Sequence, residues 1–310
     1  MIIEYLSESL LIAEHDLTSF ALTAPHRYKV YEIAKRNSKK TRTIAHPSKE
    51  LKFIQRSLVE LFEKSLDIHK AAFAYKKGLG IKDNAKAHIN SKYLLKMDFK
   101  NFFPSITPSL FFTVAEKKGV VFTAADRAIL TGLVFWKPQG RDDLILSIGA
   151  PTSPIVSNFV MNYFDEAVFD LCINRKITYT RYADDITFST KLKDNLFDLP
   201  KIIETILNET VQGIEVNSEK TIFTSKAHNR HVTGVTLTND NHISVGRDKK
   251  RLISAMIHQS KFKSLTPEDA SHILGLISFA IHIEPEFLDR ILRKYGAEVL
   301  NNIKAKAGGI

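Results

Sequence analysis

The sequence contains a single cysteine, Cys172, among its 310 residues. One thiol excludes an internal disulfide and a zinc site built from several cysteines, and it suits a reducing compartment. Charged residues interrupt every apolar run long before it reaches the length that spans a bilayer, and neither end resembles a targeting segment. Low-complexity tracts and short repeats are also absent from the sequence. We therefore expect a folded, cytoplasmic protein without a membrane partner.

Acidic residues are in the minority. The 44 Lys and Arg residues exceed the 34 Asp and Glu residues, which gives a formal net charge of +10. Such a surplus favours polyanionic partners such as RNA, DNA or an anionic membrane surface, and the charge alone does not choose among them. Hydrophobic residues make up 44% of the chain, which is enough to build a sizeable core.

The spacing of apolar residues predicts several helices. One amphipathic helix is expected to end near Leu66, with Ser48 as its N-cap and an apolar stripe formed by Leu51, Ile54, Leu58, Leu61 and Phe62. Residues 152–173 have the pattern of one long helix, and the pattern is helical again beyond Arg247. A basic run over residues 35–42 indicates a hairpin that leads into a strand.

Three carboxylates stand at the ends of predicted strands. A short buried strand ends in Asp98, and a strand pair rich in β-branched and aromatic residues turns through Asp184 and Asp185. Three clustered carboxylates repel one another unless hard cations neutralise them, and Mg²⁺ takes carboxylate oxygens and substrate phosphates as ligands. Two such ions about 3.5–4 Å apart are the usual arrangement for in-line phosphoryl displacement. The alternative is that the Asp-Asp pair only forms a turn.

The residues around these aspartates resemble two catalytic blocks of reverse transcriptases. One block is Tyr182-Ala183-Asp184-Asp185, and the other begins Met97-Asp98-Phe99-Lys100. The resemblance implies an RNA-directed DNA polymerase that binds two Mg²⁺ ions. It assigns catalysis and metal binding to Asp98, Asp184 and Asp185, and it assigns a metal-binding backbone carbonyl to Phe99.

The same resemblance implies a binding site for dNTPs. Phe103 falls where the family has a steric gate, a bulky ring that leaves no room for a ribose 2′-hydroxyl, and the alternative is an ordinary core aromatic. Gly149 and Ala150 belong to a block whose backbone lies against the incoming nucleotide. Ser147 and Ile148 stand where that block usually has Pro-Gln.

Two basic residues complete the implied nucleotide site. Arg42 lies in the fingers block, where basic residues grip the template and the triphosphate. Lys220 ends a block that lies near the leaving pyrophosphate, where it acts either as a general acid or as a screen of negative charge.

Two shorter strings resemble those that mark retron reverse transcriptases among bacterial relatives. The resemblance implies RNA binding by Asn84 and His88 of an Asn-Ala-x-x-His string and by a Val-Thr-Gly string, Val232, Thr233 and Gly234. The alternative is a helix cap and a surface histidine. The basic tail would be a thumb that recognises an RNA stem-loop through phosphate and 2′-hydroxyl contacts from Arg247, Lys249, Lys250 and Arg251.

The partners follow from the retron resemblance. The enzyme would bind a cognate structured noncoding RNA of the msr-msd type, begin synthesis at the 2′-hydroxyl of one guanosine, and produce branched RNA-linked single-stranded DNA, called msDNA. A separate effector protein encoded nearby and a role in anti-phage defence are implied as well. Two alternatives are another bacterial reverse transcriptase, of the intron-derived or phage-exclusion type, and an RNA-binding scaffold that no longer polymerises.

The fold class implied is α/β (α+β), a right-hand polymerase with an antiparallel palm sheet backed by helices. We expect residues 1–93 to form the N-terminal part of the fingers. Residues 94–238 would form the palm, with an interwoven fingers segment at about 113–148. Residues 239–310 would form an all-helical, RNA-binding thumb.

Overall fold

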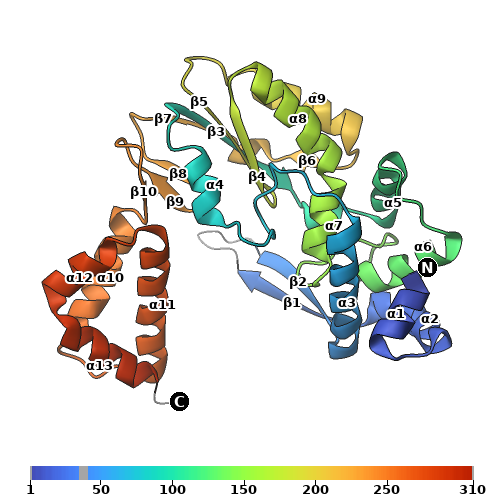
Figure 1. The fold of residues 1–310 in the computed structure, drawn as a ribbon, viewed down its shortest axis with the longest axis horizontal. Coiled ribbons are helices and arrows are strands. Elements are labelled where there is room, and N and C mark those ends of the chain that lie inside the picture. The colour runs from blue at the N-terminus through green and yellow to red at the C-terminus, as the bar shows by residue number, and fades with distance from the viewer. Residues whose placement is uncertain (1, 35–40, 309–310) are drawn as a thin grey trace.

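The computed structural model describes residues 2–34 and 41–308 (Figure 1). Residues 35–40, which are most of the basic run predicted to form a hairpin, therefore lie outside the described residues. The elements, in chain order, are α1 (Ile2–Leu10), α2 (Glu14–Thr23), η1 (Ala24–His26), β1 (Tyr28–Ala34), β2 (Thr41–Pro47), α3 (Lys49–Ser65), α4 (Ile81–Ala87), β3 (Tyr93–Lys100), η2 (Phe103–Ser105), α5 (Pro108–Lys117), α6 (Ala124–Val134), α7 (Ser153–Val160), α8 (Asn162–Asn174), β4 (Thr178–Tyr182), β5 (Asp185–Thr190), α9 (Leu199–Thr210), β6 (Glu215–Val216), η3 (Ser218–Lys220), β7 (Ile222–Ser225), β8 (Arg230–Val232), β9 (Val235–Leu237), β10 (Ile243–Ser244), α10 (Arg247–Gln259), α11 (Pro267–Ile283), α12 (Phe287–Tyr295) and α13 (Ala297–Ala307).

An antiparallel sheet forms the centre of the molecule. Its strand order is β4-β5-β3-β6, and β7 also pairs with β3. Successive side chains of a strand point to opposite faces of a sheet. Leu95, Met97 and Phe99 of β3 accordingly join the large core with α8 and α9, whereas Leu94 joins a second core on the other face. The predicted strand pair and the buried strand before Asp98 are confirmed.

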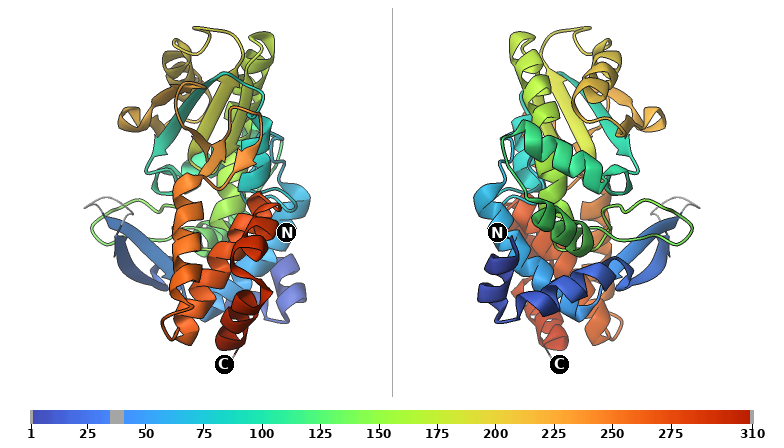
Figure 2. Two further views of the ribbon diagram at one scale, coloured as in Figure 1. Left: turned by 90° about the vertical axis from the view of Figure 1, so that its left-hand side faces the viewer. Right: turned by 90° about the vertical axis from the view of Figure 1, so that its right-hand side faces the viewer.

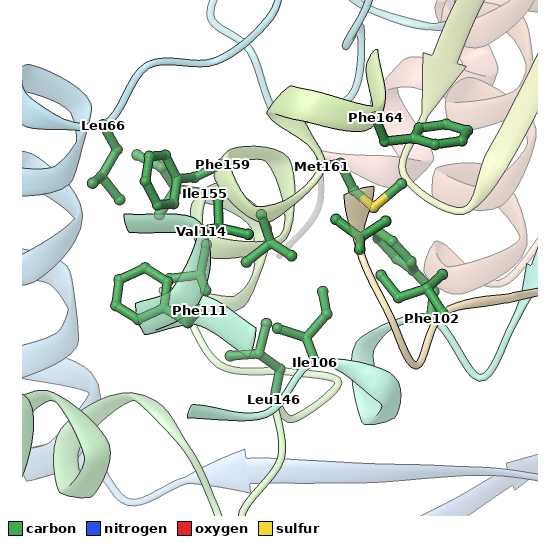
Figure 3. Packing of buried hydrophobic residues seen from close by; sticks show 14 of the residues in the cluster. Leu66, Phe102, Ile106, Phe111, Val114, Leu146, Ile155, Phe159, Met161 and Phe164 are labelled. Carbon is green, nitrogen blue, oxygen red and sulfur yellow. The ribbon is translucent and has the colours of Figure 1, made fainter. Parts of the chain in front are cut away.

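The large core fills the space between this sheet and the N-terminal helices. Phe111 is fully buried in it and contacts the rings of Phe62, Phe135 and Phe159 from α3, the end of α6 and α7. Figure 3 shows Phe111 and Phe159 among the buried side chains of this core. Helix α3 confirms the predicted amphipathic helix, and its N-cap Ser48 accepts a hydrogen bond from the backbone N–H of Leu51 at 3.2 Å. Its apolar stripe is therefore directed into the core.

The long helix predicted over residues 152–173 is wrong in one respect, because it bends at Met161 into α7 and α8. Met161 has ψ 0°, although its N–H still donates to Ser157 O at 3.2 Å. On either side of the bend, Asn158 donates to Ala74 O and Asn162 donates to Asp67 O, both at 2.9 Å. These ties to a neighbouring loop hold each half in its own direction, and apolar periodicity does not reveal them.

The C-terminal helices α10 to α13 form a bundle beside the larger body (Figures 1 and 2). Their apolar faces share the second core with the β8–β10 sheet and with α4. Glu284 is buried and joins the bundle to this sheet, because it accepts hydrogen bonds from Ser244 of β10 at 2.9 Å and from Lys250 of α10 at 2.8 Å. It also pairs with Arg290 of α12. The predicted helical tail is confirmed.

Helix α4 is anchored to the central sheet by His88, the residue that follows it. The His88 ring is fully buried, with Nδ1 2.7 Å from Ser189 Oγ and Nε2 2.8 Å from Thr180 Oγ1. Burial lowers the pKa of His88 to about 3, so the ring is neutral. The prediction that His88 contacts RNA directly therefore needs correction, because both ring nitrogens form hydrogen bonds with buried side chains of the protein.

Asn84 and Val232 need the same correction. Both are buried, and Asn84 Nδ2 lies 3.4 Å from Thr233 Oγ1 in the turn between β8 and β9. The two strings expected to contact RNA thus contact each other. Their buried members fix the β8–β9 hairpin to α4, whereas the turn residue Thr233 is half-buried and Gly234 is exposed.

A buried ion pair ties the strand β4 to α8. Arg181 donates from Nε and Nη2 to both oxygens of Asp165, with the shortest distance 2.6 Å, and neither side chain is exposed. The Tyr179 hydroxyl also donates to Asp165 at 2.7 Å, and Arg181 Nη1 donates to Asn158 Oδ1 at 3.1 Å. Every polar group of the pair therefore has a partner, which is the condition under which a buried ion pair is tolerated.

Within residues 2–34 and 41–308, none of the helices has both the length and the apolar character that a bilayer crossing requires.

Removing the acidic partner of the buried pair should destabilise the protein strongly. We expect Asp165→Ala to lower the free energy of unfolding by about 3–5 kcal/mol, because the Arg181 guanidinium would remain buried without a counter-charge. Chemical denaturation measures this loss. The matched control is Asp198→Ala, which breaks the pair between Arg175 and an Asp198 side chain that is 57% exposed and should cost about 1 kcal/mol or less. Equal losses in the two variants would contradict the expectation.

The neutral His88 should make stability depend on pH. In the unfolded chain this ring binds a proton below about 6.5, whereas in the folded protein it does so only near pH 3. The unfolded state therefore binds more protons between these values, and the free energy of unfolding should fall by up to about 1.4 kcal/mol per pH unit as the pH decreases. The stability difference between the wild type and His88→Gln should shrink over this range, and a constant difference would refute the assignment.

Candidate active site

The carboxylates of Asp98, Asp184 and Asp185 come together at one end of the central sheet. Asp98 of β3 lies directly opposite Asp185 of β5, and the N–H of Phe99 donates to Asp184 O at 3.0 Å. Opposite residues of an antiparallel pair have Cα atoms about 4.5–5.5 Å apart. Ala183 has φ +57°, a left-handed conformation that allows the chain to reverse within a tight turn. The convergence predicted from the strand ends is thus present.

The carboxylates of Asp184 and Asp185 lie in an environment that disfavours negative charge. The pKa of Asp185 is raised to about 6, first by the desolvation of its carboxylate and then by the charges of Asp184 and Asp98. The pKa of Asp184 is raised by burial and by Asp98, and the charges of Lys220 and Arg42 oppose this shift. Such a cluster is stabilised by added positive charge.

Lys220 supplies one such charge. Its Nζ lies 2.8 Å from each carboxylate oxygen of Asp98. The short η3 helix carries Lys220, and the preceding Asn217 donates its N–H to the backbone oxygen of Asp98 at 2.7 Å. Lys220 therefore contacts one of the three aspartates directly, and its ammonium group shows that the position beside Asp98 accepts a cation.

The donor set fits a hard divalent cation, because carboxylate oxygens are ligands that Mg²⁺ prefers. In the described part of the chain, no three acidic, His or Cys side chains already surround one point as a ready metal cage. In this structure the cation beside Asp98 is the Lys220 ammonium group, which is paired with the Asp98 carboxylate. Phe99, expected to offer a carbonyl, follows Asp98 directly and has a buried ring.

A cleft of about 390 Å³ opens beside the aspartates. The side chains of Asp98, Asp185 and Lys220 line one part of it, and Thr233 and Gly234 line another. These two turn residues have φ values of +46° and +79°, as in the two-residue turns that close β-hairpins. Of the five residues of the short strings, the turn pair is thus the part that reaches the cleft.

Phe103 lies at the start of η2, five residues beyond Asp98. Its ring is half-buried and packs edge-on against Phe102, with ring centroids 5.4 Å apart. Phe102 in turn stacks on Phe99 at 5.5 Å. The ring predicted as a steric gate is therefore a half-buried member of an aromatic row that begins with the buried Phe99.

The loop with Gly149 and Ala150 packs against the β1–β2 hairpin. The N–H of Ala45 donates to Ile148 O at 3.1 Å, and a Cβ on Gly149 would lie 3.2 Å from Ala45 O. Gly149 also has φ +128°, so both its backbone conformation and its surroundings favour glycine. Ala150 is buried, whereas Arg42 of β2 is exposed and its charge acts on Asp184.

A second hollow lies on the C-terminal bundle. It has a volume of about 580 Å³ and is lined by Arg247, Lys250, Arg251, Ser254, Ala255, His258, Lys294 and Tyr295. The described residues that line it include no acidic side chain. We call it the basic groove.

The four basic residues predicted in the tail differ in their surroundings. Arg247 and Arg251 are exposed in the basic groove. Lys250 is bound to Glu284 at 2.7 Å, and Lys249 lies over the Phe279 ring with Nζ 4.6 Å from its centroid. The two arginines are therefore the freer cations of the set.

Arg181 supports the site and was missed by the sequence analysis. Its Nη1 donates to Ala183 O at 3.2 Å, so the guanidinium that binds Asp165 also holds the turn before Asp184. The available signal was a charged residue in the middle of an apolar strand, three residues before the aspartate pair. Such a residue needs a buried partner, but the sequence does not say which acid supplies it.

Comparison with known proteins gives consistent results. The family described as "Reverse transcriptase (RNA-dependent DNA polymerase)" matches residues 33–237. The Retron Ec83 reverse transcriptase of Escherichia coli is 44% identical over 285 residues, which cover 91% of this chain and 91% of that protein. The Retron Ec73 reverse transcriptase of the same species is 32% identical over 303 residues, which cover 95% of each chain.

A solved structure supports the fold. The foamy viral protease-reverse transcriptase in complex with double-stranded DNA matches with a TM-score of 0.50 and 18% identity, covering 91% of this chain and 44% of that chain. At this identity the likeness concerns the fold alone, and it confirms the polymerase fold class predicted from the sequence. With the family match and the retron relatives, it follows that the chain belongs to the reverse transcriptase family, in its bacterial retron branch, and is an RNA-directed DNA polymerase.

Proposed function

We propose that this polymerase copies part of a cognate structured noncoding RNA into DNA that remains linked to that RNA, starting from a guanosine 2′-hydroxyl. The observation that carries the chemistry is the register that sets Asp98 against Asp185, with Asp184 one residue away. The retron relatives support the substrate. The product would be msDNA of the kind that the retron resemblance implies.

Asp98, Asp184 and Asp185, with the Phe99 carbonyl, would hold two Mg²⁺ ions. When bound, these ions activate the attacking hydroxyl and neutralise charge on the transferred phosphate. The protein contributes a fixed geometry, because β3, β5 and the Arg181-supported turn place the carboxylates. The raised pKa of Asp185 agrees with a site built to receive positive charge.

The incoming dNTP would lie between the aspartates and the β1–β2 hairpin. Arg42 would bind the triphosphate, since its charge already acts on Asp184. The Gly149 and Ala150 backbone would lie along the nucleotide, and Phe103 would exclude the 2′-hydroxyl. Lys220 is positioned either to protonate the leaving pyrophosphate or to screen its charge, and its contact with Asp98 supports both roles.

The rest of the chain would hold the RNA. We assign residues 1–93 to the fingers, 94–238 to the palm with the fingers segment at about 113–148, and 239–310 to the thumb. The basic groove with Arg247 and Arg251 would bind RNA phosphates. The Thr233–Gly234 turn would meet the RNA at the cleft.

The wider partners rest on the retron relatives. We infer a cytoplasmic enzyme that works with a separate effector protein in defence against phage. This setting is consistent with the net charge of +10, which suits RNA and DNA partners.

Asp184→Asn should remove DNA synthesis and preserve the fold. The amide keeps the size of the side chain but loses the charge that a metal needs, so dNTP incorporation on a primed RNA template should fall by at least roughly a hundredfold, the scale of one lost electrostatic contact in a transition state. Thermal unfolding should stay close to the wild type. Asp142→Asn, at an exposed loop position, is the matched control and should remain active. Retained synthesis by Asp184→Asn would disprove the metal assignment.

Charge reversal in the basic groove should weaken RNA binding. The double variant Arg247→Glu, Arg251→Glu should bind a structured RNA less tightly, and the slope of log K against log salt should fall by about one for each lost phosphate contact. Filter binding over a range of salt concentrations measures both quantities. The control is Lys304→Glu, Lys306→Glu, which makes the same charge change on the exposed face of α13. Identical affinity losses in both double variants would argue for a general charge effect and against the groove.

A further inference from the structure

Tyr75 stands out as an exposed aromatic residue on an unusual backbone. It lies in the loop between α3 and α4, its φ is +59°, and 53% of its surface is exposed. A left-handed conformation is uncommon for a bulky residue and tends to occur at functional sites. Glycine adopts this conformation without strain, so the backbone does not explain why a largely exposed tyrosine stands at this position.

The loop before Tyr75 is held firmly to the catalytic strand. The N–H of Phe73 donates to Arg181 O, and the N–H of Arg181 donates to Ala71 O, both at 2.8 Å. Asn158, itself a hydrogen-bond partner of Arg181, donates to Ala74 O at 2.9 Å. The strained residue therefore follows directly after a segment whose backbone is fixed by the same group that supports the catalytic turn.

This anchoring directs the Tyr75 ring to Phe103. The ring centroids are 6.4 Å apart and the planes are inclined by 60°, an edge-to-face contact. Such contacts are favourable for aromatic pairs at this separation. Burial and the charges of Asp184 and Tyr182 raise the pKa of Tyr75, and the charge of Arg42 opposes this shift, which agrees with a ring close to the aspartates.

We propose that Tyr75 is a positioning residue for nucleotide selection. Its ring holds Phe103 in place through this edge-to-face contact, and the two rings together form the wall against which the sugar of the incoming nucleoside triphosphate lies. Phe103 is supported by Phe102 on its inner side, so without Tyr75 the gate ring has a packing partner on one side only among the described ring contacts. This inference rests on the proposed role of Phe103 as a steric gate.

The test compares Tyr75→Gly with the wild type in the ratio of kcat/KM for dGTP to kcat/KM for GTP on a primed RNA template. Glycine suits the φ of this position, so the variant removes the ring without straining the backbone. We expect the ratio to fall by about three- to tenfold, the scale of one aromatic pair contact. Tyr75→Phe keeps the ring and should stay within about twofold of the wild type.

Two further variants show where the effect acts. Leu11→Gly makes the same backbone change at another exposed position, with φ +54°, and should leave the ratio unchanged. Phe103→Ala should lower the ratio on its own. Adding Tyr75→Gly to Phe103→Ala should lower it no further, because residues that act through one contact are not additive.

The outcomes separate the two proposals. If Phe103→Ala lowers the ratio and Tyr75→Gly does not, the role of Tyr75 is overturned and the gate stands. Equal losses with dGTP and GTP would also overturn it and would indicate a contact with the template strand. If Phe103→Ala leaves the ratio unchanged, the gate fails and the role of Tyr75 fails with it. A Tyr75→Phe variant as impaired as Tyr75→Gly would exclude ring packing as the cause.

Discussion

The buried ion pair between Arg181 and Asp165 is the constraint on which the active site depends. Its guanidinium binds the acid on α8, the amide of Asn158 on α7 and the backbone oxygen of Ala183 in the catalytic turn. Its backbone binds the loop at residues 71–73. Taking such a charge out of water is costly unless every polar group is satisfied. Because these partners come from four segments, they must all be in place together, and the turn before the aspartates is set by the packing of the whole core.

This arrangement has a consequence for catalysis. Three clustered carboxylates repel one another, and desolvation together with the charges of Asp184 and Asp98 raises the pKa of Asp185. A flexible turn would relieve the repulsion by moving Asp184 away from Asp98. The support from Arg181 prevents this movement, so the protein carries the electrostatic cost in advance and the site gains when positive charge arrives. Lys220 offsets part of that cost at Asp98.

The sequence predicts what depends on local pattern. The helix after Ser48 and the strands on each side of Asp184 follow from apolar periodicity and capping, and the structure confirms them. The bend at Met161 has no such signal, since it comes from side-chain ties to a loop distant in sequence. His88 was expected to bind RNA, with a surface histidine as the alternative, and only the tertiary structure supplies the two hydroxyls beside its buried ring. The local sequence pattern thus does not predict which side chains from distant segments become hydrogen-bond partners.

The contact between the two short strings also explains how the catalytic cleft and the basic groove are connected. The hairpin whose turn borders the catalytic cleft is tied to α4 through Asn84 and Thr233, and its sheet continues into the C-terminal bundle. Gly246 makes that connection with φ +90°, and a Cβ there would lie 2.8 Å from Thr236 Oγ1. Glu284 then fixes the first helix of the bundle to the same sheet. The basic groove and the aspartates are therefore joined by one short, well-anchored segment, so a nucleic acid that occupies both sites would be held in a defined position relative to the cleft.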